Sequence, residues 1–332
     1  MWVVSESAAA SHIVENTVQR LLLAAPRGYC AGVHRAVHAV ERALEIHGPP
    51  VYVRKEIVHN KTVVAQLRRQ GAIFVEEETD IPQGAITVFS AHGIAPSVRA
   101  NAQTLQLRTI DATCPLVTKV HREALHFARD GYTIVLIGHE GHEEVEGTMG
   151  EAPDRIVLVQ TEQDVEELVV EDPERLAYVT QTTLSVEETS AILARLKQRF
   201  PSIVGPRTDD ICYATTNRQA AVKELASKCE LLLVIGSRNS SNSVRLVEVA
   251  RDFGAESYLI DNKDEVREEW LTGKRVVGIS SGASAPESLV EDLVEFFRDR
   301  GVDDVSTLRT VREDVRFMLP KEIREAVPAG TS

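Results

Sequence analysis

The chain has 332 residues, of which 26% are charged and 43% hydrophobic, a composition typical of an ordinary globular protein with two or three domains. The net charge of −13 argues against a nucleic-acid partner or an anionic membrane surface. No apolar run approaches the roughly 18 residues of a membrane span, and residues 1–20 lack the pattern of a signal peptide. We therefore expect a cytoplasmic protein that binds neither membranes nor nucleic acid.

Short β-branched runs alternate with helical stretches along the chain. Strands are predicted at 20–25, 51–53, 85–90, 108–110, 133–138, 155–159, 176–180, 231–236, 257–260 and 275–279. Helices are predicted at 33–46, 116–129, 186–199, 217–229, 243–253 and 286–298. Several strands are apolar almost throughout, as is typical of parallel strands covered on both faces. The alternation predicts an α/β fold with parallel sheets.

Three of the four cysteines follow an apolar run at the point where a helix should begin. Cys30, Cys114 and Cys212 are spaced so that each domain-sized third of the chain holds one of them. Three similar α/β units, each offering one thiolate to a common centre, would form a three-cysteine iron–sulfur site with one iron open to substrate. Cys229 ends a predicted helix, and we expect it to be an ordinary core residue. No C-x-x-C pair supports a zinc ribbon or a thioredoxin-like motif.

Polar turns follow most of the predicted strands, and in parallel sheets ligands collect at these carboxyl ends. His59, His92 and His142 lie in or beside such turns, and imidazolium groups can donate to phosphate oxygens. The run 240–243 (Ser-Ser-Asn-Ser) leads into a helix, and residues 282–286 (Gly-Ala-Ser-Ala-Pro) form a second turn that leads into a helix. One of these residues is expected to be an N-cap, and hydroxyl-rich helix starts are also anion sites. Glu144, next to a polar loop, is a candidate general acid.

Eight motifs in order resemble those of the 4-hydroxy-3-methylbut-2-enyl diphosphate reductase (IspH/LytB) family. The resemblance extends from about Leu21 to Pro320 and rests on residues 26–33, 90–93, 111–117, 141–148, 180–185, 209–218, 239–243 and 282–286. It implies three pseudo-repeated αβα domains in a trefoil around a central 4Fe–4S cluster. We expect an N-terminal extension at 1–19 that is flexible, domains at 20–114, 115–208 and 209–296, and a C-terminal tail at 297–332 that packs back on the core.

The same resemblance implies the chemistry. The enzyme would be an iron–sulfur oxidoreductase that catalyses the last step of the methylerythritol phosphate pathway of isoprenoid biosynthesis. Two electrons and two protons would remove the substrate's hydroxyl group as water, giving isopentenyl and dimethylallyl diphosphate. The substrate's hydroxyl oxygen would bind the open iron, and a ferredoxin or flavodoxin would supply the electrons.

Site residues are carried over position by position. The cluster ligands would be Cys30, Cys114 and Cys212. Glu144 would supply protons, Thr182 would position the substrate's hydroxyl group, and His142 would join them in the pocket. The diphosphate would be held by His59, His92, Ser240, Asn242 and Ser284, with Ser241 adjoining.

Two positions depart from the family's usual pattern. His34 stands where Asp is common, beside Cys30 at the start of a helix, and this leaves the local charge in doubt. Glu143 stands where Pro is common and could loosen the loop that carries Glu144. Two alternatives to the reductase stay open: a non-redox iron–sulfur hydro-lyase acting on a phosphorylated substrate, and a non-catalytic iron–sulfur sensor.

Overall fold

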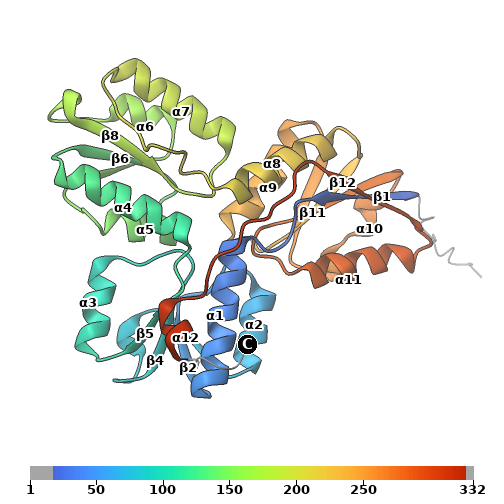
Figure 1. Ribbon diagram of the computed structural model, residues 1–332. Helices are drawn as coiled ribbons and strands as arrows, with labels where there is room; N and C mark the ends of the chain where they lie inside the picture. The colour runs from blue at the N-terminus through green and yellow to red at the C-terminus, as the bar shows by residue number, and fades with distance from the viewer. Residues whose placement is uncertain (1–17, 327–332) are drawn as a thin grey trace, which may run out of the picture.

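Three α/β lobes meet at the centre of the molecule (Figure 1). The computed structural model describes residues 18–326. The strands of this part of the chain form sheets of five, four and three strands, and all their pairings are parallel. The predicted α/β fold of three units arranged as a trefoil is confirmed.

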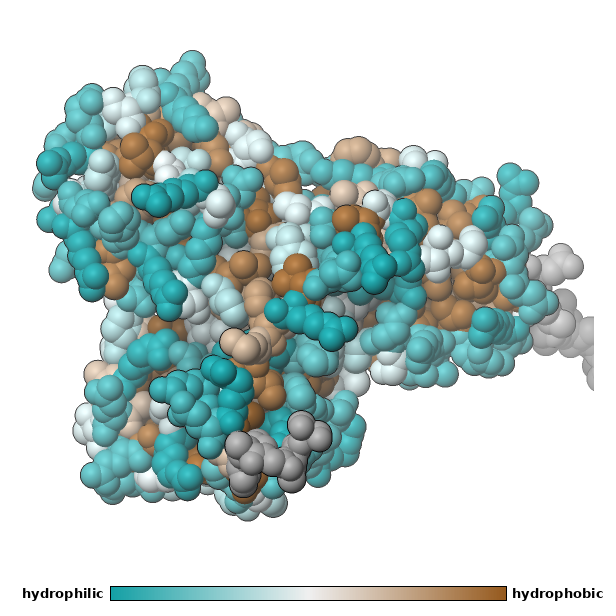
Figure 2. Space-filling model, in the orientation of Figure 1, coloured by the Kyte–Doolittle hydropathy of each residue, from teal (hydrophilic) through white to brown (hydrophobic). Residues whose placement is uncertain are grey.

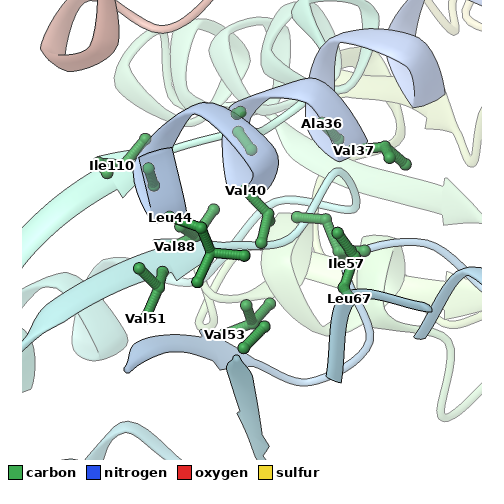
Figure 3. Packing of buried hydrophobic residues seen from close by; sticks show 14 of the residues in the cluster. Ala36, Val37, Val40, Leu44, Val51, Val53, Ile57, Leu67, Val88 and Ile110 are labelled. Carbon is green, nitrogen blue, oxygen red and sulfur yellow. The ribbon is translucent and has the colours of Figure 1, made fainter. Parts of the chain in front are cut away.

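The first lobe is built on a four-stranded sheet of order β3-β2-β4-β5. Its elements are β2 (Val51–Arg54), β3 (Ala72–Val75), β4 (Ile86–Phe89), β5 (Arg108–Asp111), α1 (Ala31–His47), α2 (Lys61–Arg69), η1 (Glu78–Asp80) and α3 (Pro96–Thr104). Apolar residues recur along α1 at helical spacing, and the face that they form packs on the sheet. Val40 and Leu44 on this face lie with Val51, Val53 and Val88 in one buried core (Figure 3).

The second lobe has a three-stranded sheet of order β7-β6-β8. Its elements are α4 (Pro115–Arg129), β6 (Thr133–Ile137), α5 (Glu143–Met149), β7 (Ile156–Val159), α6 (Glu162–Glu167), η2 (Pro173–Arg175), β8 (Leu176–Thr180) and α7 (Val186–Arg199). Alternate residues of β6 enter two different cores, Ile134 and Leu136 on one face and Val135 and Ile137 on the other. Burial on both faces explains why this strand is apolar throughout.

The third lobe has a five-stranded sheet of order β10-β9-β11-β1-β12. Its elements are β1 (Arg20–Ala25), α8 (Tyr213–Ala226), β9 (Leu231–Ile235), α9 (Ser241–Asp252), β10 (Glu256–Ile260), η3 (Lys263–Glu265), α10 (Glu268–Leu271), β11 (Val276–Ser281), α11 (Glu287–Arg298) and β12 (Asp304–Arg309). The N-terminal strand β1 lies inside this sheet, between β11 and β12.

The sheets differ from the expected domain ranges at both ends of the chain. The first unit was expected to start at residue 20, but β1 belongs to the third sheet, and the chain reaches the first lobe only at α1. The expected tail, 297–332, supplies β12 to the third sheet and then α12 (Lys321–Ala326), which packs on α1 and β5 of the first lobe. A parallel strand can pair with a distant segment, so sequence order does not reveal these partners. Most of the expected flexible extension, residues 1–17, lies outside the described residues.

The segment between β12 and α12 crosses the centre of the molecule from the third lobe to the first (Figure 1). Hydrophilic residues cover most of the three lobes on this face, and apolar residues are visible in the centre where the lobes meet (Figure 2). We call residues 310–320 the crossing segment.

Candidate active site

A cavity lies where the three lobes meet, at the carboxyl ends of the strands. The space between its lining residues, with the open mouth included, is about 730 Å³. Every residue predicted for the site lines it: Cys30, Cys114, Cys212, His59, His92, His142, Glu144, Thr182, Ser240, Ser241, Asn242 and Ser284. The structure therefore brings together all the residues that the sequence analysis selected.

Each of the three cysteines is the N-cap of a helix. Cys30 precedes α1, Cys114 precedes α4 and Cys212 precedes α8, so each lobe directs one helix start at the cavity. The Cys30 sulfur accepts a hydrogen bond from the backbone N–H of Val33 at 3.4 Å. Helix N-termini stabilise negative charge and thereby favour the thiolate form of a cysteine.

Burial opposes that preference. Burial, together with the neighbouring Cys30 sulfur, raises the pKa of Cys114 to about 12 and that of Cys212 to about 11. Without a compensating cation, these two side chains are neutral thiols. A bound metal would displace their protons, because a coordinating thiol is deprotonated outright.

The spacing of the cysteines suits a group larger than one ion. Within residues 18–326, the three ligating side chains whose ligand atoms all lie within 4.8 Å of one another are His59, His92 and Glu143, so at least one pair of the three cysteine sulfur atoms is more than 4.8 Å apart. A single tetrahedral zinc ion, with Zn–S bonds of about 2.3 Å, would hold its sulfur atoms about 3.8 Å apart. Three widely spaced thiols fit the ligand chemistry of an iron–sulfur cluster.

Three histidines form one wall of the cavity. The rings of His59 and His92 stack with their centroids 4.0 Å apart, and His142 meets both of them edge-on. Among the described residues that line the cavity there is no lysine or arginine. An anion in this space would therefore depend on imidazole, hydroxyl and amide donors.

The histidines differ in protonation. Although burial alone would lower the pKa of His92, the Glu143 carboxylate, 3.1 Å from its Nδ1, raises that pKa above its ordinary value. Burial lowers the pKa of His142 to about 3, and His92 and His59 contribute to this shift. His142 is therefore neutral, and its Nδ1 accepts the backbone N–H of Glu144 at 3.1 Å, which leaves the proton on Nε2.

Opposite the histidines, the start of α9 presents hydroxyl and amide groups. Ser240 is the N-cap, as one residue of this run was expected to be, and its hydroxyl accepts the backbone N–H of Ser243. Both amide atoms of Asn242 are buried and have no hydrogen-bond partner in the protein. Buried polar groups are rarely left unpaired, so this side chain, on the cavity wall, is suited to a polar ligand.

The turn at 282–286 provides no side-chain cap to the helix that follows it, unlike the turn at 240–243. The N-cap of α11 is Pro286, and no side chain caps this helix. Ser284 instead donates its hydroxyl to the backbone carbonyl of His59 at 3.0 Å, which ties the third lobe to the first at the cavity edge.

Glu144 and Thr182 form a buried pair. The Glu144 carboxylate accepts the backbone N–H of Thr182 at 2.9 Å, and the Thr182 hydroxyl lies 3.0 and 2.9 Å from its two oxygens. Burial raises the pKa of Glu144 above its ordinary value, although these hydrogen bonds oppose the shift. The result is a carboxyl group that retains its proton more readily than a solvated one and lies on the cavity wall.

The two positions that depart from the family's usual pattern, 34 and 143, have different surroundings. His34 is exposed on α1, where its ring meets that of His38 edge-on at 5.8 Å. The expectation that Glu143 would loosen the loop carrying Glu144 is not met by the structure: Glu143 begins helix α5 and is hydrogen-bonded to Ser90 and His92 of the first lobe.

The sequence analysis missed two residues at the site. Phe317, in the crossing segment, lines the cavity, although a single aromatic residue in a polar segment gives no sequence signal. Arg218 is fully buried and donates to the backbone carbonyl of Gly28 at 2.8 Å and to Glu313 at 3.1 Å. It thereby fixes the turn before Cys30 to α8 and to the crossing segment.

A protein-family model described as "LytB protein" matches residues 21–298. The chain belongs to this family. Two curated relatives named 4-hydroxy-3-methylbut-2-enyl diphosphate reductase, from Leifsonia xyli and Mycobacterium ulcerans, are each 57% identical. The match to the first relative covers 93% of this chain and 92% of that protein. The match to the second covers 98% of both chains.

Solved structures of LytB-family enzymes are also similar. The E-1-hydroxy-2-methyl-but-2-enyl-4-diphosphate reductase of Plasmodium falciparum has a TM-score of 0.90 at 38% identity, over 93% of this chain and 98% of that one. A second structure, described as the terminal enzyme of the non-mevalonate pathway, has a TM-score of 0.62 at 32% identity, over 85% of this chain and all of that one. Within residues 18–326, no helix has the length and apolar character needed to cross a bilayer.

Proposed function

We propose that this chain is a 4-hydroxy-3-methylbut-2-enyl diphosphate reductase, as its relatives are named. The reaction takes one substrate molecule, two electrons and two protons, breaks the bond between carbon and the hydroxyl oxygen, and gives isopentenyl or dimethylallyl diphosphate and water. One observation carries the proposal: a single cavity combines three convergent thiols with a wall of histidine, hydroxyl and amide donors and a buried carboxyl group. Each part of this combination serves one part of the reaction.

Cys30, Cys114 and Cys212 would hold a 4Fe–4S cluster by their three sulfur atoms. When bound, the cluster supplies the electrons and an iron without a protein ligand, where the substrate's hydroxyl group can be activated. The protein positions the three thiols at three helix starts, whose dipoles favour the thiolate form.

The diphosphate would lie between the histidine wall and the start of α9. His92 and His59 face it from the first lobe, and Ser240, Ser241 and Asn242 face it from the third, with Ser284 at the edge. Donors in this arrangement hold an anion without a lysine or arginine, in keeping with a protein of net charge −13.

Glu144 would provide the proton that turns the leaving hydroxyl group into water. Its carboxyl group is buried, held by Thr182, and retains a proton at a higher pH than an exposed glutamate. A positioned general acid typically contributes about 10²–10⁴-fold to the rate. The Thr182 hydroxyl, bonded to the same carboxyl group, would orient the substrate's hydroxyl group. His142, neutral with its proton on Nε2, offers one further donor.

The electrons would come from an electron carrier such as a ferredoxin or flavodoxin.

The decisive experiment is turnover by anaerobically reconstituted protein with a chemical reductant. We expect isopentenyl and dimethylallyl diphosphate to form in proportion to the electrons consumed. A hydro-lyase would give a product with no net consumption of reductant, and a sensor would neither turn the substrate over nor bind a diphosphate.

A further inference from the structure

Glu143 joins two lobes behind the histidine wall. It is the first residue of α5 in the second lobe, and its Oε2 lies 3.1 Å from the Ser90 hydroxyl and 3.1 Å from Nδ1 of His92 in the first lobe. Glu143 itself does not line the cavity, whereas His92 does. The carboxylate is therefore in contact with the rear edge of a ring whose other edge is available to the cavity.

We propose that Glu143 is a positioning residue that keeps His92 as an imidazolium, with Nδ1–H held by the carboxylate and Nε2–H directed at the diphosphate. This inference rests on the proposed function, in which His92 binds the diphosphate. It assigns Glu143 an indirect role in anion binding, through His92.

The groups around His92 show why a nearby carboxylate is needed. The His59 ring stacks on it at 4.0 Å and His142 meets it edge-on, and burial and the charge of His92 lower the pKa of both, so His92 is the one of the three rings that holds the proton. Burial disfavours the charged form of His92. The opposing groups are the carboxylates of Glu143, Glu144 and Glu56, and Glu143 contributes most of the three.

Glu143 is suited to this role because it is ionised. Although burial alone would raise the pKa of Glu143, its contact with His92 and the more distant His59 and Lys55 lower that pKa to about 2. The pair is therefore an ion pair at neutral pH. The His92 imidazolium lines the cavity and the Glu143 carboxylate does not. An anion in the cavity would therefore contact the positive charge of the pair.

Two substitutions remove the carboxylate without disturbing the helix. Glu143→Gln keeps the size and the hydrogen-bonding capacity of the side chain. Glu143→Pro introduces proline at the first helical position, which tolerates it. The preceding residue, His142, has φ −78° and ψ 136°, an extended conformation that is compatible with a following proline. Glu140→Gln, an equal change of charge at an exposed position in the turn before α5, is the matched control.

The test measures binding of inorganic pyrophosphate to anaerobically purified holoenzyme between pH 5.5 and 8.5. In the parent protein, His92 stays charged to a higher pH, so affinity should persist to a higher pH than in either variant. Because one pKa unit corresponds to a tenfold change in equilibrium, we expect both variants to bind roughly tenfold more weakly above pH 7.5. At pH 5.5, where a larger fraction of His92 is protonated in every protein, we expect the difference in affinity between the variants and the parent to be smaller.

Calorimetry in two buffers of different ionisation enthalpy gives an independent readout. At pH 7.5 the variants should take up more protons on binding pyrophosphate than the parent, because His92 starts neutral in them. Glu140→Gln should match the parent in both measurements. Equal weakening at every pH, or proton uptake identical to that of the parent, would overturn the role of Glu143.

His92→Asn separates this inference from the proposed function. If His92→Asn binds pyrophosphate as the parent does, His92 is not part of the anion site, and the assignment of the diphosphate site fails together with the inference. If His92→Asn binds weakly while Glu143→Gln and Glu143→Pro behave like the parent, only the inference about Glu143 fails.

Discussion

The sulfur atom of Cys114 lies 2.7 Å from the point where a Cβ on Gly32 would stand, and the Cys30 sulfur lies 3.8 Å from it. Carbon and sulfur atoms that are not bonded do not approach as closely as 2.7 Å without repulsion. Any side chain at position 32 would therefore displace the Cys114 sulfur from its present place.

Gly32→Ala is expected to push the Cys114 side chain out of place while leaving α1 intact, since alanine favours helix. Iron content and visible absorbance after anaerobic reconstitution should fall strongly, and the circular dichroism should stay that of the parent. Ala31→Gly, at the adjacent position, serves as a control and should retain iron. Full iron loading of Gly32→Ala would contradict the assigned packing of the two thiols.

Serine substitutions should divide the four cysteines into two classes. Cys30→Ser, Cys114→Ser and Cys212→Ser should lose most of the bound iron. Cys229 packs in a hydrophobic core beside Gly278 and does not line the cavity, so Cys229→Ser should keep iron content near that of the parent. Loss of iron in Cys229→Ser, with retention in any of the other three, would show that the ligand set is wrong.

Glu144→Gln should retain iron and bind substrate but lose about 10²–10⁴-fold in turnover, because the amide cannot give up a proton. In the parent, activity should fall as the pH rises through the raised pKa of Glu144, since only the protonated form acts as an acid. This limb of the pH profile should be missing from the residual activity of the variant. Glu146→Gln, at an exposed position of the same helix, should keep the parent's profile. Near-normal turnover in Glu144→Gln would place the acid elsewhere.

Asn242→Ala should separate binding from stability. Since both amide atoms lack a partner in the protein, their removal should leave the thermal unfolding midpoint unchanged or raise it. Pyrophosphate binding should weaken by roughly ten- to a hundredfold, the loss of one hydrogen bond to a charged group. A variant that is destabilised yet binds pyrophosphate normally would assign Asn242 a purely structural role.

Glu313→Ala should destabilise the protein by about 3–5 kcal/mol, because it leaves the fully buried guanidinium of Arg218 without its carboxylate partner. Urea unfolding monitored by circular dichroism would measure this loss. Asp314→Ala removes the neighbouring acid, whose partner Arg312 is exposed, and should have little effect. Equal stability of the two variants would contradict the importance of the buried pair.

Sequence patterns predicted most of the fold because most elements are long or strongly apolar. The predicted strands 20–25 and 176–180 and the helix 186–199 coincide with β1, β8 and α7. The strand β3 was missed because it has only four residues and begins just after a two-residue turn from α2. The strand β12 was missed because only two of its six residues, Val305 and Leu308, are apolar. Short helices such as α5 and α6 have too few turns to show a period.

The sequence predicted which residues line the cavity, but not the hydrogen bonds between residues of different lobes. The residues occupy turns after strands, and parallel sheets gather such turns at one edge. The hydrogen bonds that Glu143 accepts from Ser90 and His92, and the one that Ser284 donates to the carbonyl of His59, connect different lobes. Contacts of this kind depend on how the lobes are packed, which local sequence does not encode.

The position of β1 has a consequence for biosynthesis. This strand is translated about 250 residues before its two neighbours in the sheet, β11 and β12. Chains grow at about 5–20 residues per second, and N-terminal domains usually fold first. Here the third sheet cannot close until residue 309 has been added, and the turn carrying Cys30 follows β1 directly. We therefore expect a chain that ends before residue 309 to leave β1, and the turn with Cys30 that follows it, without a full set of strand partners and to load iron poorly.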